Sequence, residues 1–346
     1  MSHTCSRRRS RRLLGHAADR HDAVRRAIAP RTAQRDAGAI TELTPPLPCH
    51  ELVGASGTPV IVVLGGISAT RHVTATPDDL SAGWWQSVVG PARTIDTTRC
   101  RVLSIDYLDG GVAPGGRPAA IVTTHDQADA LARVLDAIGI ARVQAIVGAS
   151  YGGMVALAFA ERYGERVEQL VVISAAHEPH PMSTALRTVQ RSIVQLGLET
   201  GRAHDALVLA RALAVTTYRS AREFAARFDS APDSVEADDA VFPVQHYLRH
   251  HGERFALRWR AERFLALSLS GDLHRVDPRR IRTPTVLIAA EGDTLVPLEQ
   301  MERLTSLLDG PSELECLPTI FGHDAFLAEP AAIARVLTAA LSRHRA

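Results

Sequence analysis

The stretch "IVGASYGGMVALAFAERY" (146–163) begins as an apolar run and turns through glycines into a helical pattern. At its centre, "GASYG" (148–152) matches G-x-S-x-G between an expected strand and an expected helix. Glycines on both sides of a serine permit a sharp turn that lifts its hydroxyl off the sheet. At this glycine content a chance match to the motif has a probability of roughly one in ten, so the motif alone is weak evidence. Its position between a strand and a helix is what makes it specific. We predict that Ser150 is a nucleophile; the alternative is a tight turn that happens to contain serine.

Short apolar runs alternate with amphipathic stretches on both sides of this motif. Runs rich in valine and ended by glycine or polar residues predict strands that are covered on both faces. In residues 125–139, apolar side chains recur three and four positions apart, which predicts a helix with one apolar face. Strand–helix alternation predicts a parallel sheet with right-handed crossovers. The four expected strands are "PVIVVLGGIS" (59–68), "RVLSIDYL" (101–108), "VQAIVGAS" (143–150) and "VEQLVVISAA" (167–176).

The alternation stops after residue 176 and resumes near residue 271. Between them the chain shows helical patterns, so we predict a helical lid over 177–270 and an α/β core over 45–176 and 271–346. The fold class is therefore α/β, with a mostly parallel sheet flanked by helices. The resumed pattern predicts a strand over 283–293, a helix over 297–308, a strand over 312–318 and a final helix over 324–344.

Composition limits the function classes. The 346 residues carry a net charge of +1, which argues against nucleic-acid binding. Ten arginines fall in residues 1–40, and we expect 1–44 to be an Arg-rich disordered tail, since its two leucines are too few for a signal peptide. The sequence contains no apolar run of about 18 residues, so it predicts no membrane-spanning helix. The four scattered cysteines indicate neither a metal site nor a disulfide framework, so we expect reduced thiols in a cytoplasm.

A nucleophilic serine needs a base and a carboxylate that orients the base. On this type of fold the partners follow the serine in the order acid, then histidine. Asp293 lies just past the expected strand "TVLIAA", and His323 lies in a glycine turn after the last expected strand. The alternatives are a helix cap for Asp293 and a surface turn for His323.

An acyl-transfer site also needs donors for the oxyanion. The backbone N–H of Tyr151 follows the serine, and a second donor is expected from the loop after the first strand, at Ile67 or Gly66. The alternative is that the glycines of this loop only turn the chain. The remaining histidines show no metal-ligand spacing, and the phosphate-binding glycine patterns are absent, so we expect neither a metal nor a nucleotide cofactor.

Several longer segments resemble the homoserine O-acyltransferases of methionine biosynthesis, which have an α/β-hydrolase fold with a helical lid. The likeness covers about residues 45 to 340; "GWW…GP…IDT" and "GHDAFL" are specific to that family, whereas the elbow alone is not. The segments are "GWWQSVVGPARTIDTTRCRVLSIDYLDGG" (83–111), "VGASYGGMVALAFAERY" (147–163), "LRTVQRSIV" (186–194), "YRSAREFAARF" (218–228), "YLRHHGERF" (247–255) and "GHDAFL" (322–327).

The resemblance implies acyl transfer from an acyl-CoA to the hydroxyl of homoserine through an acyl-serine. It implies that Arg191 holds the substrate carboxylate and that Asp324 takes the substrate ammonium, because a zwitterion needs one cation and one anion. A solvated lid arginine and a helix cap are the alternatives for these two residues. The resemblance also implies a cytoplasmic homodimer with small-molecule substrates and no bound cofactor, the acyl-CoA being a substrate.

Around the acyl pocket this sequence departs from the family pattern. The elbow has Ala149 and Tyr151 where the family usually has Gly and Met, and "GGISATRHV" and "DYLDGG" also differ. The resemblance is closest to the succinyl-using branch. Succinyl transfer needs a cation for the distal carboxylate, and Arg187, one helical turn before Arg191, is the candidate, with Arg71 behind it.

Three other activities stay open at this level. Acetyl-CoA is the commoner donor of the family, and serine differs from homoserine by one methylene, which is worth only about 1–3 kcal/mol in a pocket. An α/β-hydrolase esterase would use the same serine, acid and base with water as the acceptor. A binding module that lost its chemistry is disfavoured by the intact order of Ser150, Asp293 and His323.

Overall fold

A seven-stranded sheet forms the centre of the molecule, as the computed structural model shows for residues 47–113 and 116–342. The strand order is β1-β5-β2-β8-β9-β12-β13, and every neighbouring pair is parallel except β1 with β5. This confirms the predicted α/β class with a mostly parallel sheet. The strands are β1 (His50–Val53), β2 (Val60–Leu64), β5 (Arg101–Ile105), β8 (Ala145–Ala149), β9 (Leu170–Ile173), β12 (Thr285–Ala290) and β13 (Ser312–Leu317).

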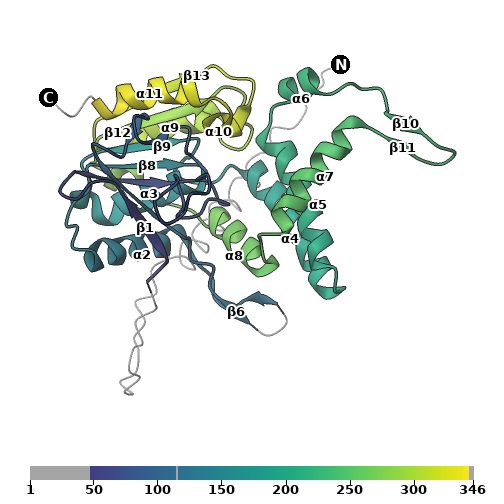
Figure 1. The fold of residues 1–346 in the computed structure, drawn as a ribbon, viewed down its shortest axis with the longest axis horizontal. Coiled ribbons are helices and arrows are strands. Elements are labelled where there is room, and N and C mark those ends of the chain that lie inside the picture. The colour runs from purple at the N-terminus through teal and green to yellow at the C-terminus, as the bar shows by residue number, and fades with distance from the viewer. Residues whose placement is uncertain (1–46, 114–115, 343–346) are drawn as a thin grey trace, which may run out of the picture. The chain divides into compact units, whose positions relative to one another are not determined.

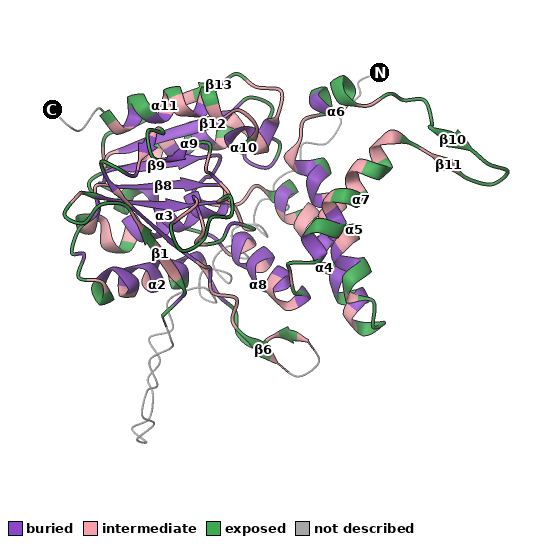
Figure 2. Cartoon of the chain, in the orientation of Figure 1, coloured by how far each residue is buried: buried purple, intermediate pink, exposed green. Residues whose placement is uncertain are grey.

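Both faces of the sheet are covered, which explains why its inner strands read as continuous apolar runs. Successive side chains of a strand point to opposite faces. In β2, Val60, Val62 and Leu64 join one hydrophobic cluster, and Ile61 and Val63 join the other. The first cluster includes α2 (Thr124–Ala137), α3 (Tyr151–Tyr163) and α9 (Leu298–Leu307), and the second includes α11 (Pro330–Ser342). Figure 2 shows the buried strands between these layers.

Five helices lie between β9 and β12 in the sequence. Four of them, at residues 181–199, 203–218, 243–256 and 261–272, pack around a cluster of their own that contains Val194, Leu207, Phe255 and Phe264. Figure 1 shows α4, α5 and α7 beside the sheet and its helices, with α8 between them and an exposed hairpin projecting outward. The elements are α4 (Pro181–Glu199), α5 (Ala203–Tyr218), α6 (Ala221–Arg227), α7 (Pro243–Ala256), α8 (Ala261–Asp272) and the hairpin of β10 (Ser234–Val235) with β11 (Ala240–Val241).

Two elements differ from the sequence-based expectation. The antiparallel edge strand β1 was not expected, because it is short and only half-buried and so has no apolar run. The final helix, expected as one element from residue 324, is broken into α10 (Ala325–Ala328) and α11, which are bent by 85°. Pro330 begins α11, and a proline cannot continue a helix because it lacks the N–H and restricts the residue before it. The tail expected over 1–44 and the last four residues lie outside the described part of the chain.

Short elements complete the connections. They are the strand pairs β3 (Val89–Gly90) with β4 (Ile95–Asp96) and β6 (Val112–Ala113) with β7 (Arg117–Pro118), and the 3-10 turns η1 (Gly164–Arg166), η2 (Pro278–Arg280) and η3 (Gly322–Asp324).

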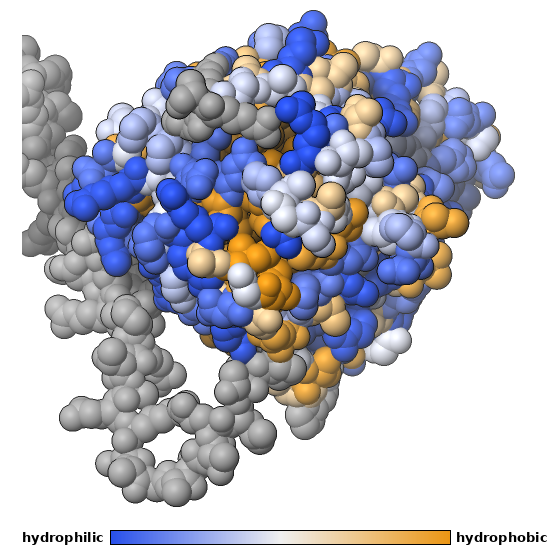
Figure 3. Space-filling model, turned by 60° about the vertical axis from the view of Figure 1, so that its left-hand side comes forward, coloured by the Kyte–Doolittle hydropathy of each residue, from blue (hydrophilic) through white to orange (hydrophobic). Residues whose placement is uncertain are grey.

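The surface is mostly hydrophilic with local apolar areas. On the face drawn in Figure 3, hydrophobic side chains gather in one area and hydrophilic ones surround it. On α4, Met182, Val189 and Leu196 are exposed and follow one another at seven-residue spacing. Over the described residues no single helix is both long and apolar enough to cross a membrane, and only the bent pair 322–328 and 330–342 meets that requirement jointly.

Backbone segments approach one another closely at the turn between β8 and α3. Ser150 has φ +53° and ψ −120°, a conformation that side-chain-bearing residues rarely adopt. A Cβ on Gly148 would lie 2.4 Å from the carbonyl oxygen of Gly152, and a Cβ on Gly152 would lie 2.2 Å from that of Leu64. Both glycines therefore let β8, α3 and β2 approach at backbone distance.

We expect Gly152→Ala to lower the free energy of unfolding by about 1–3 kcal/mol, because the backbone it would strike cannot move aside as a flexible side chain can. Gly271→Ala in α8 is the matched control, since its Cβ would meet only the Tyr151 side chain, at an ordinary contact distance of 4.0 Å. We expect it to change stability by less than about 1 kcal/mol. Chemical denaturation of both variants measures the difference, and equal stabilities would contradict the packing argument.

Candidate active site

The carboxyl ends of three parallel strands bring three residues of the sequence analysis together. Ser150 follows β8, Asp293 follows β12, and His323 lies in η3 after β13. His323 Nε2 lies 2.7 Å from Ser150 Oγ, and His323 Nδ1 lies 2.7 Å from Asp293 Oδ2. Parallel strands end at the same edge of a sheet, which is why residues far apart in sequence meet there.

Asp293 is fixed by the backbone of its own turn. Its Oδ1 accepts hydrogen bonds from the N–H groups of Leu295 and Val296, both at 2.9 Å, while Oδ2 faces His323. The carboxyl group is fully buried, so it has no water to compete for these contacts. The two backbone bonds orient the carboxylate, and the carboxylate in turn orients the imidazole.

The environment of His323 favours its protonated form. Burial by itself lowers the pKa of this imidazole, but the charge and hydrogen bond of Asp293, with a smaller contribution from Asp324, outweigh it. The pKa of His323 is therefore raised above its ordinary value of 6.5. A proton taken up from the serine would thus be held more strongly than by a free imidazole.

Two backbone N–H groups lie beside the serine. Tyr151 is the first residue of α3, so its N–H has no acceptor within the helix. The loop after β2 approaches from the other side: a Cβ on Gly66 would lie 3.9 Å from Ser150 Cβ, and Ile67 lines the same cavity. The carbonyl oxygen of Gly65 accepts the N–H of Gly152 at 3.0 Å and the hydroxyl of Tyr107 at 2.7 Å, which holds this loop against the elbow.

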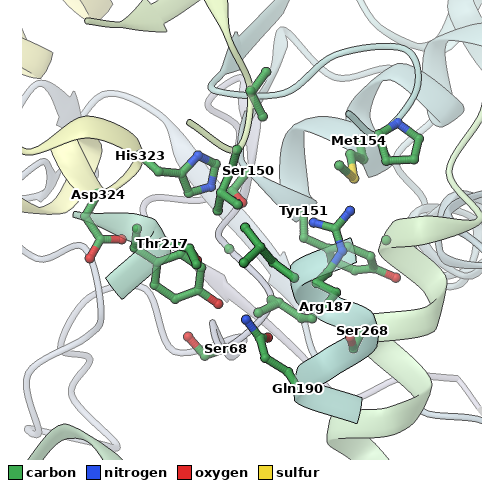
Figure 4. A pocket seen from close by; sticks show the side chains of 18 of the residues that line it. Ser68, Ser150, Tyr151, Met154, Arg187, Gln190, Thr217, Ser268, His323 and Asp324 are labelled. Atoms are coloured by element: carbon green, nitrogen blue, oxygen red, sulfur yellow. The ribbon is translucent and has the colours of Figure 1, made fainter. Parts of the chain in front are cut away.

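Ser150 and His323 line a cavity of about 210 Å³ between the edge of the sheet and the helices that follow β9. Figure 4 shows Ser150 and His323 projecting toward the same space, with Asp324 on one side and Arg187 with Tyr151 on the other. Most of the wall is apolar or aromatic. The charged side chains on it are Glu178, Arg187, Arg211 and Asp324.

Arg187 and Arg191, both on α4, share one carboxylate. Arg187 Nη2 lies 2.6 Å and Arg191 Nη1 lies 2.5 Å from the two oxygens of Asp272 on α8. Arg191 also donates to Ser268 Oγ and Thr188 Oγ1, at 3.0 and 3.1 Å. Arg187 lines the cavity, whereas Arg191 lies behind it. The sequence analysis did not anticipate Asp272.

Arg71, the other cation considered for the acyl group, lies away from the cavity wall. Its side chain pairs with Asp106, and its backbone N–H donates to the same carboxylate at 2.8 Å.

Asp324 faces the cavity beside His323. It begins α10, but its side chain makes no capping hydrogen bond to that helix. Instead Asp324 Oδ2 lies 3.0 Å from Arg219 Nε, and Arg219 Nη1 lies 3.0 Å from Glu223 Oε1. Sequence reasoning missed Arg219, although it belongs to the quoted segment 218–228, because only the fold brings α5 next to η3.

The side chain of Tyr151 joins the elbow to two helices. Its hydroxyl lies 2.7 Å from Ser270 Oγ on α8 and 3.3 Å from Gln127 Nε2 on α2. Burial raises the pKa of Tyr151 to about 12, although both hydrogen bonds act in the opposite direction. The phenol therefore stays neutral and connects the elbow to the lid, a contact that the sequence pattern did not reveal.

In the part of the chain that the structure describes, no three His, Cys, Asp or Glu side chains are grouped as metal ligands would be.

Comparisons with known proteins agree with the fold and identify the family. A family model described as alpha/beta hydrolase fold matches residues 59–330. The solved homoserine O-acetyltransferase from Bacillus anthracis superposes with a TM-score of 0.76, at 19% identity, covering 85% of this chain and 91% of that one. The sheet, elbow and helical insertion thus define an α/β-hydrolase-fold protein.

Relatives of known activity identify the family within this fold class. A homoserine O-succinyltransferase of Xanthomonas campestris pv. campestris is 42% identical over 292 residues, which cover 84% of this chain and 78% of that protein. A serine O-succinyltransferase of Frateuria aurantia is 31% identical over 316 residues, with 78% and 84% covered. A homoserine O-acetyltransferase of Leifsonia xyli is 33% identical over 315 residues, with 78% and 77% covered. The chain belongs to this homoserine O-acyltransferase family.

The raised pKa of His323 predicts how the reactivity of Ser150 depends on pH. Only the neutral imidazole can take the serine proton, so labelling of Ser150 by a fluorophosphonate should fall as the pH drops, with a midpoint above 6.5. Asp293→Asn removes the contacts that raise this pKa; we expect the midpoint to move to lower pH and the labelling rate to fall about 10³–10⁴-fold. Asp309→Asn, whose carboxylate meets only the exposed Arg282, is the control. A wild-type midpoint at or below 6.5 would contradict the assignment.

Proposed function

We propose that this protein transfers a succinyl group from succinyl-CoA to the hydroxyl of L-homoserine. The observation that carries the proposal is the hydrogen-bonded row Ser150–His323–Asp293 opening into a cavity with charged side chains on its wall. The 42% identity to a homoserine O-succinyltransferase supports the choice of donor and acceptor. An acyl-CoA and an amino acid are then the small-molecule substrates, in a step of methionine biosynthesis.

The geometry supports a ping-pong reaction in two mirrored halves. Ser150 Oγ attacks the thioester carbonyl while His323 Nε2 takes the hydroxyl proton, and the N–H groups of Tyr151 and Ile67 receive the oxyanion. The intermediate collapses to an acyl-serine and CoA leaves as the thiol, with the proton from His323. Homoserine then attacks the ester with its hydroxyl, again losing its proton to His323, and O-succinylhomoserine and free Ser150 result. Asp293 stays ionised and stabilises the imidazolium of His323 in both half-reactions.

The amino-acid substrate needs one anion and one cation. Asp324 is proposed to take the ammonium group, since it borders the cavity next to His323. For the carboxylate we propose Arg191 on the strength of the family resemblance and add Arg219 as a second candidate. Arg219 is supported by its contact with Asp324, because this pair already sets a cation and an anion 3.0 Å apart beside the catalytic imidazole.

The acyl group extends toward Arg187 in this proposal. Arg187 Nη2 is buried and makes no aligned hydrogen bond, although it lies 2.6 Å from Asp272 Oδ1. A buried N–H donor without an acceptor is costly, and a carboxylate at the end of a succinyl chain would satisfy it.

Related activities fit the same machinery. Acetyl-CoA as donor or serine as acceptor would leave every catalytic step unchanged, and the relatives above include a serine O-succinyltransferase and a homoserine O-acetyltransferase. Water as acceptor would make the protein an esterase, and the solved esterase E22 shares the fold with a TM-score of 0.74. We place homoserine succinyl transfer first because the relative with that activity has the highest identity among those named here.

The proposal includes a cytoplasmic homodimer that uses no metal or bound cofactor, since acyl-CoA enters and leaves as a substrate. The dimer is supported by the exposed apolar residues Met182, Val189 and Leu196, whose seven-residue spacing on α4 forms one stripe along the helix.

CoA release measured with purified protein tests the proposed reaction. We expect release with succinyl-CoA and homoserine to exceed release with acetyl-CoA or with serine, and Ser150→Ala to lower it by at least about 10³-fold. Release that does not need an amino acid would mean hydrolysis. Preference for acetyl-CoA would leave the triad in place and overturn the acyl assignment.

Arg187→Ala tests the acyl contact. Loss of a charged hydrogen bond should lower kcat/KM for succinyl-CoA about 10- to 100-fold and leave acetyl-CoA within a few-fold. Thermal unfolding of the variant serves as the control, because Arg187 also pairs with Asp272. Equal use of the two donors by wild type and variant would remove Arg187 from the acyl site.

A further inference from the structure

Two adjacent tryptophans, Trp84 and Trp85, have no role in the reaction described so far. Trp85 is 1% exposed, and Trp84 is half-buried and lines the cavity. Their rings are stacked, with centres 5.3 Å apart and planes 12° from parallel. Each indole N–H donates to a backbone carbonyl, and the two carbonyls belong to different parts of the candidate active site. The stacked pair therefore connects two segments that are far apart in the sequence.

Trp85 contacts the segment that carries His323. Its Nε1 donates to the carbonyl oxygen of Phe326 at 2.9 Å, in a buried hydrogen bond that joins residues 241 positions apart. Phe326 lies in α10, which directly follows the turn η3 that contains His323. This hydrogen bond therefore restricts where the turn with the imidazole can lie relative to the sheet.

Pro330 explains why this carbonyl needs a donor from outside the helix. In a continuous α-helix the carbonyl of Phe326 would accept the N–H of residue 330, but proline has no N–H. The preceding carbonyl, that of Ala325, does accept the N–H of Glu329 at 2.9 Å. Trp85 thus supplies the hydrogen bond that is missing where α10 ends. Since a buried carbonyl without a donor is costly, this contact stabilises the position of α10.

Trp84 contacts the loop after β2, on the other side of Ser150. Its Nε1 donates to the carbonyl oxygen of Thr70 at 3.1 Å. Its ring lies against Gly65, where a Cβ would be 2.7 Å from the ring carbons Cζ2 and Cη2. Gly65 and Thr70 flank Ile67, the residue proposed as the second oxyanion donor. One side chain thus holds this loop on both sides of that donor.

The two segments that the tryptophans contact meet beside the serine. A Cβ on Gly66 would lie 3.8 Å from Phe326 Cζ and 3.9 Å from Ser150 Cβ. His323 Nε2 lies 2.7 Å from Ser150 Oγ. Proton transfer between these atoms depends strongly on their placement, since a displacement of about 1 Å can lower a rate about 100-fold.

We propose that Trp85 is a positioning residue for His323, and that its stacked neighbour Trp84 keeps the loop after β2 in register with the same imidazole. The indole of Trp85 contacts no reacting atom and acts through the carbonyl of Phe326. The inference rests on the proposed function only for the roles of Ser150 and His323, and it holds for any acyl donor and acceptor.

Trp85→Phe removes the N–H donor and keeps an aromatic ring against Trp84. We expect the rate of Ser150 labelling by a fluorophosphonate to fall about 10- to 100-fold. With succinyl-CoA and homoserine, kcat for CoA release should fall by a similar factor. Both KM values should stay within about twofold, because Trp85 does not line the cavity and no substrate contact is lost.

Replacement of Trp85 by benzothienylalanine separates the hydrogen bond from the volume of the ring. Sulfur takes the place of the N–H in this amino acid and the bicyclic shape is kept, so the variant should fold even if Trp85→Phe does not. We expect it to slow labelling as much as Trp85→Phe does.

Ile95→Ala is the matched control for lost stability. Ile95 is 1% exposed and belongs to the same hydrophobic cluster as Trp85, but it does not line the active-site cavity. We expect this variant to unfold at a lower temperature, as Trp85→Phe does, and to label at the wild-type rate.

Trp84→Phe tests the connection to the loop. It removes the indole N–H that reaches Thr70 and should slow labelling of Ser150. Because the two rings act as a unit, the variant with both changes should be slowed by less than the product of the two separate factors. A double variant slowed by the full product would overturn the role of Trp84.

Slow labelling of the Trp85 variants together with normal labelling of Ile95→Ala supports the proposal. Labelling of either folded Trp85 variant at the wild-type rate, an equal loss in Ile95→Ala, or a raised KM with unchanged kcat overturns it. If the wild type were labelled but released no CoA with any donor and acceptor, the proposed function would fail while the labelling rates would still decide the role of Trp85.

Discussion

The structure depends on the close approach of backbone at one turn. Ser150 adopts a strained conformation because β8 must end and α3 must begin within a single residue. The positions two residues before and two residues after Ser150 require glycine, since a Cβ on Gly148 or Gly152 would lie 2.4 or 2.2 Å from a backbone oxygen. The same close contact lets the N–H of Gly152 hold the carbonyl of Gly65, which places the loop after β2 beside the serine. One packing constraint therefore presents the Ser150 hydroxyl and positions the loop that we propose to supply the second oxyanion donor.

In and around the cavity, an apolar wall is combined with charged side chains, of which some have an ion-pair partner among the described residues and others do not. Asp272 forms ion pairs with both Arg187 and Arg191, Asp324 pairs with Arg219, and the guanidinium of Arg211 lies over two aromatic rings. In an apolar setting a paired charge contributes mainly to positioning, whereas an unpaired one attracts a ligand of opposite sign. In the proposed reaction, this distribution gives an acyl chain and a zwitterionic amino acid separate contacts within one cavity beside Ser150.

The sheet and the row of reactive groups follow from local sequence. Apolar runs predicted the inner strands because both faces are covered, and the helix after the elbow followed from its apolar spacing. The order Ser150, Asp293, His323 pointed to three strand ends, and parallel pairing brings strand ends to one edge. The prediction failed where local pattern carries little information: at β1, which is short and half-exposed, and at the last helix, where Pro330 breaks an otherwise continuous apolar spacing.

The sequence by itself determined the α/β class, the elbow and the three residues that meet at it, because strand periodicity and glycine sterics act over a few residues. Only the tertiary structure decided how each cation is used. Arg187, Arg191, Arg211 and Arg219 are alike in sequence, and their charges are distinguished by Asp272, by two aromatic rings and by Asp324. Those partners lie on other helices, and electrostatic interactions depend on distance and burial that no spacing along the chain records.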